Sequence, residues 1–178
     1  FELRGDVEAR RIGAAVLGAL GEGAGRHGGR VIKTIGDSVM CTFPAAMNGL
    51  LAATDMQKRV AQDPVFMKDN LAIRVGLHHG DTLLEDNDVY GDAVNTAARM
   101  EQLAKREQIV TTATTVAGIN PGAVRSRSLG TARVSGKQFP LEIVDVLTGG
   151  VRIEVSERDK RVSAFVPLRP WPDQAAHR

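Results

Sequence analysis

The residues best suited to chemistry lie in the run Asp88-Val-Tyr-Gly-Asp-Ala-Val-Asn95-Thr-Ala-Ala-Arg99. We expect this run to begin as a polar loop and to continue as a helix, on which Asn95 and Arg99 share one face. The same spacing places Gln102 and Arg106 on that face. An amide beside a guanidinium near a helix start suits an anionic, phosphate-bearing ligand. A solvated helix face that happens to carry Asn and Arg is the alternative interpretation.

A second candidate group lies in the run Gly28-Gly-Arg-Val-Ile-Lys33-Thr-Ile-Gly36-Asp37-Ser-Val-Met-Cys-Thr-Phe43. Two stretches of β-branched and apolar residues flank Gly36-Asp37, a pair that favours a tight turn between strands. The carboxylate of Asp37 is a hard oxygen ligand, which suits Mg²⁺ or Mn²⁺. A lone aspartate at a hairpin tip can also serve only to form the turn.

Together these motifs resemble those of the class III nucleotide cyclases. In that family a Lys-Thr-Ile-Gly-Asp hairpin precedes a Tyr-Gly-Asp-x-Val-Asn-x-Ala-x-Arg helix, and this sequence matches both in order. The strand between them, Ile73-Arg-Val-Gly-Leu-His-His-Gly80, is similar to the family's Val-Gly-Leu/Ile-His-x-Gly strand. The resemblance extends from about Glu2 to Leu147. It implies an α+β fold with a ferredoxin-like βαββαβ core and additions.

The resemblance implies an adenylate cyclase, which converts ATP to 3′,5′-cyclic AMP and pyrophosphate. Arg99 would lie over the α-phosphate and Asn95 would orient the ribose. Lys137 would hold the β- and γ-phosphates. This assignment rests on a short Gly-Lys match, and the alternative is a surface lysine in a turn. Lys33 is a donor and Asp88 an acceptor, and this order complements adenine rather than guanine. Guanylate-forming relatives carry Glu and a small residue, often Cys, at these two positions.

Two divalent cations, Mg²⁺ or Mn²⁺, are the implied cofactors, and Asp37 matches one of the two aspartates that bind them in the family. The other belongs to a Phe-x-Asp-Ile/Val strand before the first helix. No residue matches it, because Phe1 leads directly into Glu2-Leu-Arg-Gly-Asp6. Three explanations for the missing aspartate remain. The sequence begins too late, the domain is degenerate, or residues after Phe1 are absent from the numbered chain, and we favour the third explanation. A degenerate domain would bind nucleotide or regulate without turnover.

The resemblance also implies a homodimer with composite active sites, in which the metal aspartates of one subunit face the base, ribose and phosphate contacts of the other. ATP and the regulatory or sensor domains of a longer parent protein are further expected partners. Nucleic acid is not expected, since the net charge is only +2 and the chain has one Trp and one Tyr. Guanylate cyclase is a second alternative. Diguanylate cyclase is remote, because its Gly-Gly-Asp/Glu-Glu-Phe signature is absent.

The chain of 178 residues suits one domain with a tail. We expect the cyclase domain over 1–148, with its first strand missing or incomplete, and a tail or the start of a further domain over 149–178. No apolar run is long enough to span a bilayer, and no signal peptide is visible. The single cysteine, Cys41, is compatible with a reducing compartment and is expected to be a core thiol. We therefore expect a cytoplasmic domain, or the cytoplasmic part of a larger or membrane-tethered protein.

Hydrophobic spacing predicts the elements that position these residues. We expect helices over 6–24, 44–62 and 112–119 beside the one that carries Asn95. The expected strands are 30–43 as a hairpin, 71–80, 81–85 beside it, 108–111, 124–133 and 141–147. The stretch 85–88 is expected to be a polar loop. His78 and His79 are adjacent on a strand, so their side chains are expected to point to opposite faces, one toward the core and one toward the surface.

Overall fold

The computed structural model of the chain describes the backbone of residues 2–36, 38–119, 122–147 and 162–167. Its first half consists of two long helices around a hairpin, followed by a short helix and a buried strand. These elements are α1 (Glu2–Arg26), β1 (Arg30–Ile35), β2 (Ser38–Phe43), α2 (Ala46–Gln62), α3 (Pro64–Lys68) and β3 (Val75–His79). The predicted hairpin over 30–43 is confirmed, and Gly36 adopts a φ of 59° at its turn, where a left-handed conformation favours glycine.

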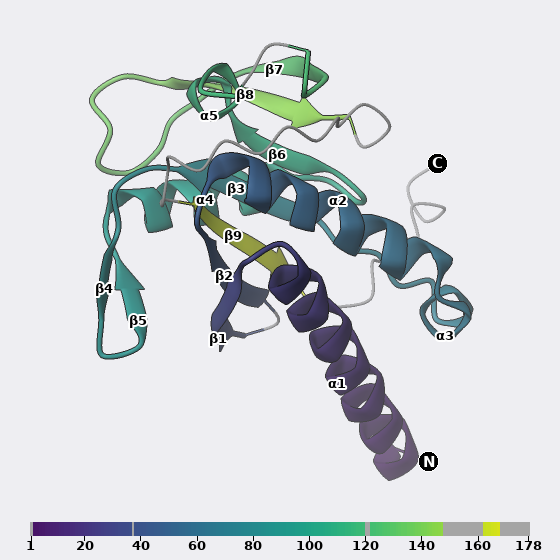
Figure 1. The fold of residues 1–178 in the computed structure, drawn as a ribbon. Helices are drawn as coiled ribbons and strands as arrows, with labels where there is room; N and C mark the ends of the chain where they lie inside the picture. Colours follow the sequence, from purple (N-terminus) through teal and green to yellow (C-terminus); the bar gives the residue numbers. More distant parts are fainter. Residues whose placement is uncertain (1, 37, 120–121, 148–161, 168–178) are drawn as a thin grey trace.

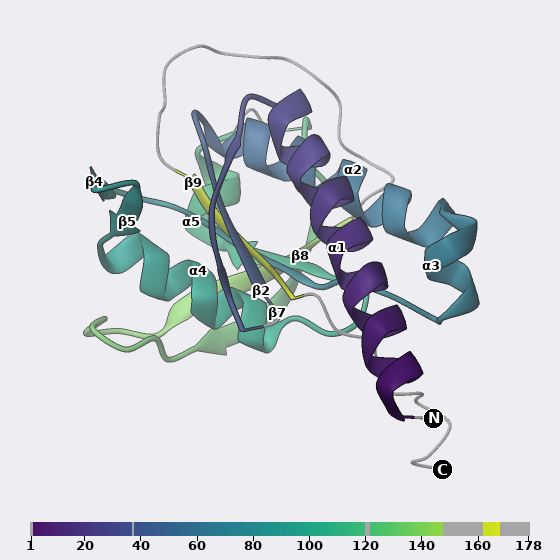
Figure 2. The same ribbon diagram turned by 90° about the horizontal axis from the view of Figure 1, so that it is seen from below.

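The second half adds a small hairpin, one long helix and the strands that extend the sheet. These elements are β4 (Leu83–Glu85), β5 (Asp88–Tyr90), α4 (Asp92–Leu103), β6 (Ile109–Thr112), α5 (Ala113–Ala117), β7 (Ser126–Ala132), β8 (Leu141–Val146) and β9 (Val162–Pro167). The described strands form a seven-stranded sheet in the order β1-β2-β9-β3-β6-β8-β7 and a separate β4-β5 hairpin. Figures 1 and 2 show α1 and α2 on one face of the large sheet and α4 on the other.

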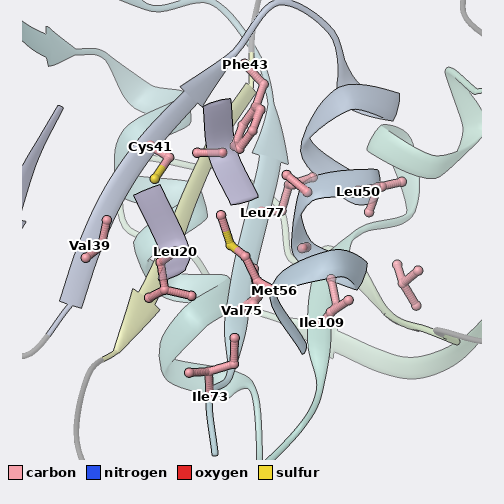
Figure 3. Packing of buried hydrophobic residues seen from close by; sticks show 14 of the residues in the cluster. Leu20, Val39, Cys41, Phe43, Leu50, Met56, Ile73, Val75, Leu77 and Ile109 are labelled. Carbon is pink, nitrogen blue, oxygen red and sulfur yellow. The ribbon is translucent and has the colours of Figure 1, made fainter. Parts of the chain in front are cut away.

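Strand β2 separates two hydrophobic cores. Val39 and Cys41 belong to the main cluster, which lies against α1 and α2 (Figure 3). Met40, which alternates with them, packs instead with Val89 and Ala97 on the α4 side. This alternation follows from the two-residue period of a strand. Cys41 has no exposed surface, and its burial raises the pKa of the thiol to about 12, so the predicted core thiol is confirmed.

The centre of the sheet is completed by a C-terminal strand. β9 lies between β2 and β3, is antiparallel to both, and pairs all six of its residues with β2 and four with β3. The resulting order β3-β9-β2-β1, with α1 and α2 on one face, is that of a ferredoxin-like core in which β9 takes the place of the first strand. The predicted α+β fold is therefore confirmed. The strand in first position comes from the stretch predicted as a tail.

The prediction that 81–85 forms a strand beside β3 is wrong. The stretch 81–85 does not pair beside β3, because β4 pairs with β5 in a hairpin of its own. Asp86 and Asn87 form its turn with φ values of 51° and 61°, the left-handed conformations that Asp and Asn tolerate best. The expected polar loop is therefore a tight turn, and Asp88 begins a strand rather than a loop. Among the described residues, no helix combines the length and apolar character needed to cross a membrane.

We predict that removal of β9 unfolds the domain. A chain that ends at Leu147 would leave backbone groups of β2 and β3 without partners at the centre of the sheet. At about 1 kcal/mol for each lost hydrogen bond, the loss approaches the 5–15 kcal/mol that typically stabilise a domain, as rough orders of magnitude. Circular dichroism should show a broad, non-cooperative melt, whereas a chain that ends at Pro167 should melt cooperatively. A cooperative melt of the shorter chain at the same temperature would contradict the central placement of β9.

Candidate active site

Helix α4 carries the candidate residues Asn95 and Arg99, and two glycines, one within β3 and one just after it, let the helix approach the sheet closely. A Cβ on Gly76 would lie 1.9 Å from Glu101 N and 2.6 Å from Ala97 O, so the helix rests directly on the β3 backbone. A Cβ on Gly80 would lie 2.9 Å from the Cβ of Ala93. These contacts fix the height of α4 above the sheet along most of its length.

The C-terminal end of α4 is held by a largely buried ion pair. Arg74 Nε donates to Glu101 Oε1 at 2.7 Å, and the two side chains are only 17% and 10% exposed. Arg74 Nη1 also lies 3.5 Å from Ala104 O, just beyond the last turn of the helix. Because charged groups this far from water need a partner, the pair fixes the position of the helix end relative to the residue before β3.

Lys33 and Asp88 come from different elements and meet at one edge of the sheet. Lys33 Nζ donates to Asp88 Oδ2 at 2.6 Å, which joins β1 to the first residue of β5. The hydrogen bond from Lys33 lowers the pKa of Asp88, and a bond from the backbone N–H of Val89 lowers it further. Asp88 is therefore an ionised acceptor beside a cationic donor. The structure brings together two residues that the sequence separates by 55 positions.

Asn95 and Arg99 lie on α4 as predicted, four residues apart on one face. Asn95 is exposed and Arg99 is partly buried. Arg99 Nε donates to Arg133 O at 3.3 Å, and Arg99 Nη1 donates to Gln102 Oε1 at 3.4 Å. The prediction that Arg106 continues this face is wrong, because α4 ends at Leu103.

Arg106 instead makes a contact on another part of the surface. It lies in the turn after α4 and donates from Nη2 to Asn70 Oδ1 at 2.8 Å. Helical spacing therefore does not predict the position of Arg106, because this residue lies beyond the end of the helix.

Lys137 lies beside the first turn of α4. Its Nζ is 2.5 Å from Asp92 Oδ2, and the side chains are 32% and 52% exposed. The sequence motifs predicted Lys137 as a site residue but did not single out Asp92. The position of Asp92 directly after Gly91, at the start of the helix, is the feature that could have identified it. Gly91 has a φ of 132°, which lets β5 turn into α4 within one residue.

His78 lies beneath this region. It is 9% exposed, and its Nδ1 is 2.9 Å from Thr112 Oγ1. Burial lowers the pKa of His78 to about 4, and the nearby charge of Lys137 adds to this effect. The imidazole is therefore neutral near pH 7, and the predicted core histidine is confirmed. His79, the next residue, is partly buried.

The predicted metal ligand Asp37 lies outside the described residues. Within the described part of the chain, no three side chains of His, Cys, Asp or Glu gather closely enough to hold a metal ion. Strand β9 pairs with β2 up to Ser38, the residue after Asp37, but its sequence Val162-Ser-Ala-Phe-Val-Pro167 contains no carboxylate. The second aspartate that the resemblance implies is therefore not supplied by the strand in first position.

The described site is thus a row of polar groups that starts just before α4 and continues along this helix. At one end lies the Lys33–Asp88 pair, which can donate and accept; along the helix lie an amide and a guanidinium; and beside its first turn lies Lys137. Guanidinium and ammonium groups suit phosphoryl oxygens, and a donor beside an acceptor suits the edge of a base. Such an arrangement can hold a nucleotide with several phosphates.

Comparison with known proteins identifies the family. The family model of the adenylate and guanylate cyclase catalytic domain matches residues 16–144. The chain belongs to this family. The match includes the hairpin, β3 and α4, so the family resemblance seen in the sequence motifs is confirmed over residues 16–144.

Known cyclases resemble the chain in sequence and in fold. A candidate adenylate cyclase from Rhizobium meliloti is 43% identical over 82 residues, which are 45% of this chain and 14% of the relative's length. An adenylate/guanylate cyclase/hydrolase from Silicibacter pomeroyi is 26% identical, with a TM-score of 0.62 over 71% of this chain and 76% of that one. A guanylate cyclase domain from Catenaria anguillulae, solved with GTP, shares the fold at 24% identity, with a TM-score of 0.62 over 75% and 80% of the two chains.

We predict that Gly76→Ala destabilises this cyclase domain by about 3 kcal/mol, the upper range for overpacking, because the new methyl group would meet the backbone of α4. Urea denaturation followed by circular dichroism would measure the change. Gly18→Ala is the matched control, since a Cβ at this exposed helical position meets nothing within 4 Å. The control should raise stability by about 0.5–1 kcal/mol, as replacing glycine within a helix usually does. Equal effects of the two substitutions would show that α4 does not rest on Gly76.

Proposed function

We propose that this domain is an adenylate cyclase that converts ATP to 3′,5′-cyclic AMP and pyrophosphate. The observation that carries the proposal is the 2.6 Å contact between Lys33 and Asp88, at one end of the row that also contains Asn95 and Arg99. Membership of the cyclase family supports a nucleotide substrate, and the Lys33–Asp88 pair supports the choice of adenine.

The choice of base follows from the order of donor and acceptor. Adenine presents an exocyclic amine that donates and a ring nitrogen that accepts, whereas guanine presents the reverse at the same edge. The lowered pKa of Asp88 keeps its carboxylate an acceptor, and Lys33 is a donor. With GTP, the donor Lys33 would face a donor of guanine or the acceptor Asp88 would face an acceptor. Polar groups left without a hydrogen-bond partner in a binding site reduce affinity.

The reaction joins the ribose O3′ to the α-phosphorus and breaks the bond from that phosphorus to the pyrophosphate oxygen. The hydroxyl proton leaves O3′, and pyrophosphate departs with the electron pair of the broken bond. We assign Arg99 to the phosphoryl oxygens, where negative charge grows, and Asn95 to the ribose that must align for attack. Lys137 is assigned to the β- and γ-phosphates. Donors aimed at developing charge typically contribute about 3 kcal/mol each to transition-state stabilisation.

Divalent cations, Mg²⁺ or Mn²⁺, are part of the proposal, with Asp37 as one ligand. Their role would be to acidify the 3′-hydroxyl and to neutralise phosphate charge. The described residues do not themselves complete a ligand set, and β9 brings no carboxylate to the hairpin. The lack of a carboxylate in the sequence of β9 favours a second candidate function, a cyclase-like domain that binds nucleotide or regulates without turnover.

We propose that the active site is shared between two copies of the chain. Large apolar side chains lie exposed on the elements that surround the site: Ile35, Leu83, Leu84, Tyr90 and Phe139. Exposed apolar groups gathered around a polar site are typical of an interface between protein chains. In the proposed homodimer, Asp37 of one copy faces the α4 residues of the other. Activity should then rise with protein concentration.

We also propose that this domain works within a longer, cytoplasmic protein. The chain spans 14% of the length of the Rhizobium meliloti relative. Regulatory or sensor domains in such a protein could control activity by changing how the two copies are oriented. The buried, reduced thiol of Cys41 is compatible with a reducing compartment.

Turnover of ATP and GTP, measured in parallel with Mn²⁺ and with Mg²⁺, tests the proposal. We expect cyclic AMP to form preferentially. We predict that Lys33→Glu combined with Asp88→Cys shifts the preference toward GTP by at least tenfold, because the donor and acceptor order is reversed. Lys58→Glu, on the exposed side of α2, is the control for charge and should leave the preference unchanged. No product from either nucleotide with a folded protein would favour the non-catalytic alternative.

Complementation tests the shared site. Asp37→Ala and Arg99→Ala should each reduce kcat by about a hundredfold or more, because each removes one side of the proposed composite site. Mixing the two variants should restore up to a quarter of the original activity, since a mixed dimer contains one site with both groups intact and mixed dimers make up about half of the population. Activity of the mixture no greater than that of the separate variants would refute the shared site.

A further inference from the structure

The ion pair between Asp92 and Lys137 has no role in the chemistry proposed above. The carboxylate belongs to the first turn of α4, the helix that also carries Asn95 and Arg99. It lies 2.5 Å from Lys137 Nζ. The cation assigned to the β- and γ-phosphates is therefore paired with an anion of its own chain.

The backbone on both sides supports this contact. Lys137 N donates to Val134 O at 3.1 Å and closes the turn that presents the lysine. A Cβ on Gly136, which has a φ of 83°, would lie 3.2 Å from Asp92 Oδ1, so the turn passes next to the carboxylate. On the helix side, Thr96 Oγ1 donates to Asp92 O at 2.9 Å. The fold itself, rather than two long side chains meeting by chance, brings the charges together.

Asp92 also lies in line with the other proposed phosphate contact. Arg99 follows it by seven residues, or two helical turns, so both residues are on one face of α4. Arg99 Nε reaches Arg133 O in the same connection between β7 and β8 that presents Lys137. Of the two cations assigned to the phosphate chain, Lys137 thus belongs to this connection and Arg99 contacts it, while the Asp92 carboxylate pairs with Lys137.

We propose that Asp92 is a positioning residue that competes with pyrophosphate for Lys137 and so limits how tightly the product is held. The inference rests on the proposed function, in which Lys137 binds the β- and γ-phosphates. Binding of the triphosphate exchanges the carboxylate for a phosphate as the partner of Lys137, and departure of pyrophosphate reverses the exchange. The carboxylate thereby helps release a highly charged product, a step that limits the rate of many enzymes.

Asp92→Asn removes the competing charge and keeps the size of the side chain. We expect the full chain with this substitution to bind inorganic pyrophosphate about two- to fivefold more tightly, the range expected for an ion pair of this exposure. Isothermal calorimetry at one fixed ionic strength would measure the affinity. The KM for ATP should fall by a similar factor while kcat does not rise. Asp92→Glu, which keeps the charge, should bind pyrophosphate nearly as the unchanged chain does.

Two further substitutions isolate the effect on Lys137. Glu142→Gln removes one negative charge from an exposed position on β8 and should leave pyrophosphate affinity unchanged. Lys137→Ala should weaken pyrophosphate binding, and in that background Asp92→Asn should have no additional effect. Melting temperatures of all the variants verify that each one folds.

The inference is overturned if the unchanged chain does not bind pyrophosphate, or if Asp92→Asn weakens binding or leaves it the same. It is also overturned if the gain persists without Lys137 or is matched by Glu142→Gln. Calorimetry requires no turnover, so the two proposals can fail separately. Tighter binding through Lys137 without cyclic AMP formation supports the competition of Asp92 with pyrophosphate for Lys137 and refutes the cyclase function. Cyclic AMP formation by the unchanged chain, together with unchanged pyrophosphate affinity in Asp92→Asn, supports the cyclase function and refutes the role of Asp92.

Discussion

The close approach of α4 to β3 at Gly76 is the constraint on which the candidate site depends. No side chain larger than hydrogen fits between the β3 backbone and the helix, because a Cβ would fall 1.9 Å from Glu101 N. The Arg74–Glu101 pair then holds the far end of the helix with little exposure to water. Every polar group assigned to ribose or phosphate is on this helix or contacts it. The packing of one glycine therefore sets the height of the helix that carries or contacts the ribose and phosphate groups.

The short stretch from Asp88 to Asp92 places two carboxylates near the start of that row. Asp88 pairs with Lys33 on β1, and Asp92 pairs with Lys137 in the connection between β7 and β8. Gly91 makes this possible, because its φ of 132° turns the strand into the helix without an intervening loop. Two carboxylates only four residues apart thus face different elements, and each controls a different cation of the proposed nucleotide site.

Local patterns predicted the hairpin, α4 and the buried thiol, because turn residues and hydrophobic periodicity act over a few neighbouring positions. They failed at β4–β5, where a run of polar residues looked like a loop although Asp86 and Asn87 suit a two-residue turn. They also failed at Arg106, since the helical count continued past the true end of α4. The C-terminal strand could not be placed either, because its partners β2 and β3 are distant in sequence and pair through backbone groups common to every residue.

The sequence by itself determined the family, the α+β class and the types of group available for chemistry, because these depend on residue identity and short spacing. Tertiary structure alone decided that Lys33 meets Asp88 across 55 positions, that Asp92 meets Lys137, and that β9 completes the centre of the sheet. Ion pairing and strand pairing act through space, and their partners are chosen by how the helices pack on the sheet. Short-range patterns in a single chain therefore do not predict which distant residues become partners.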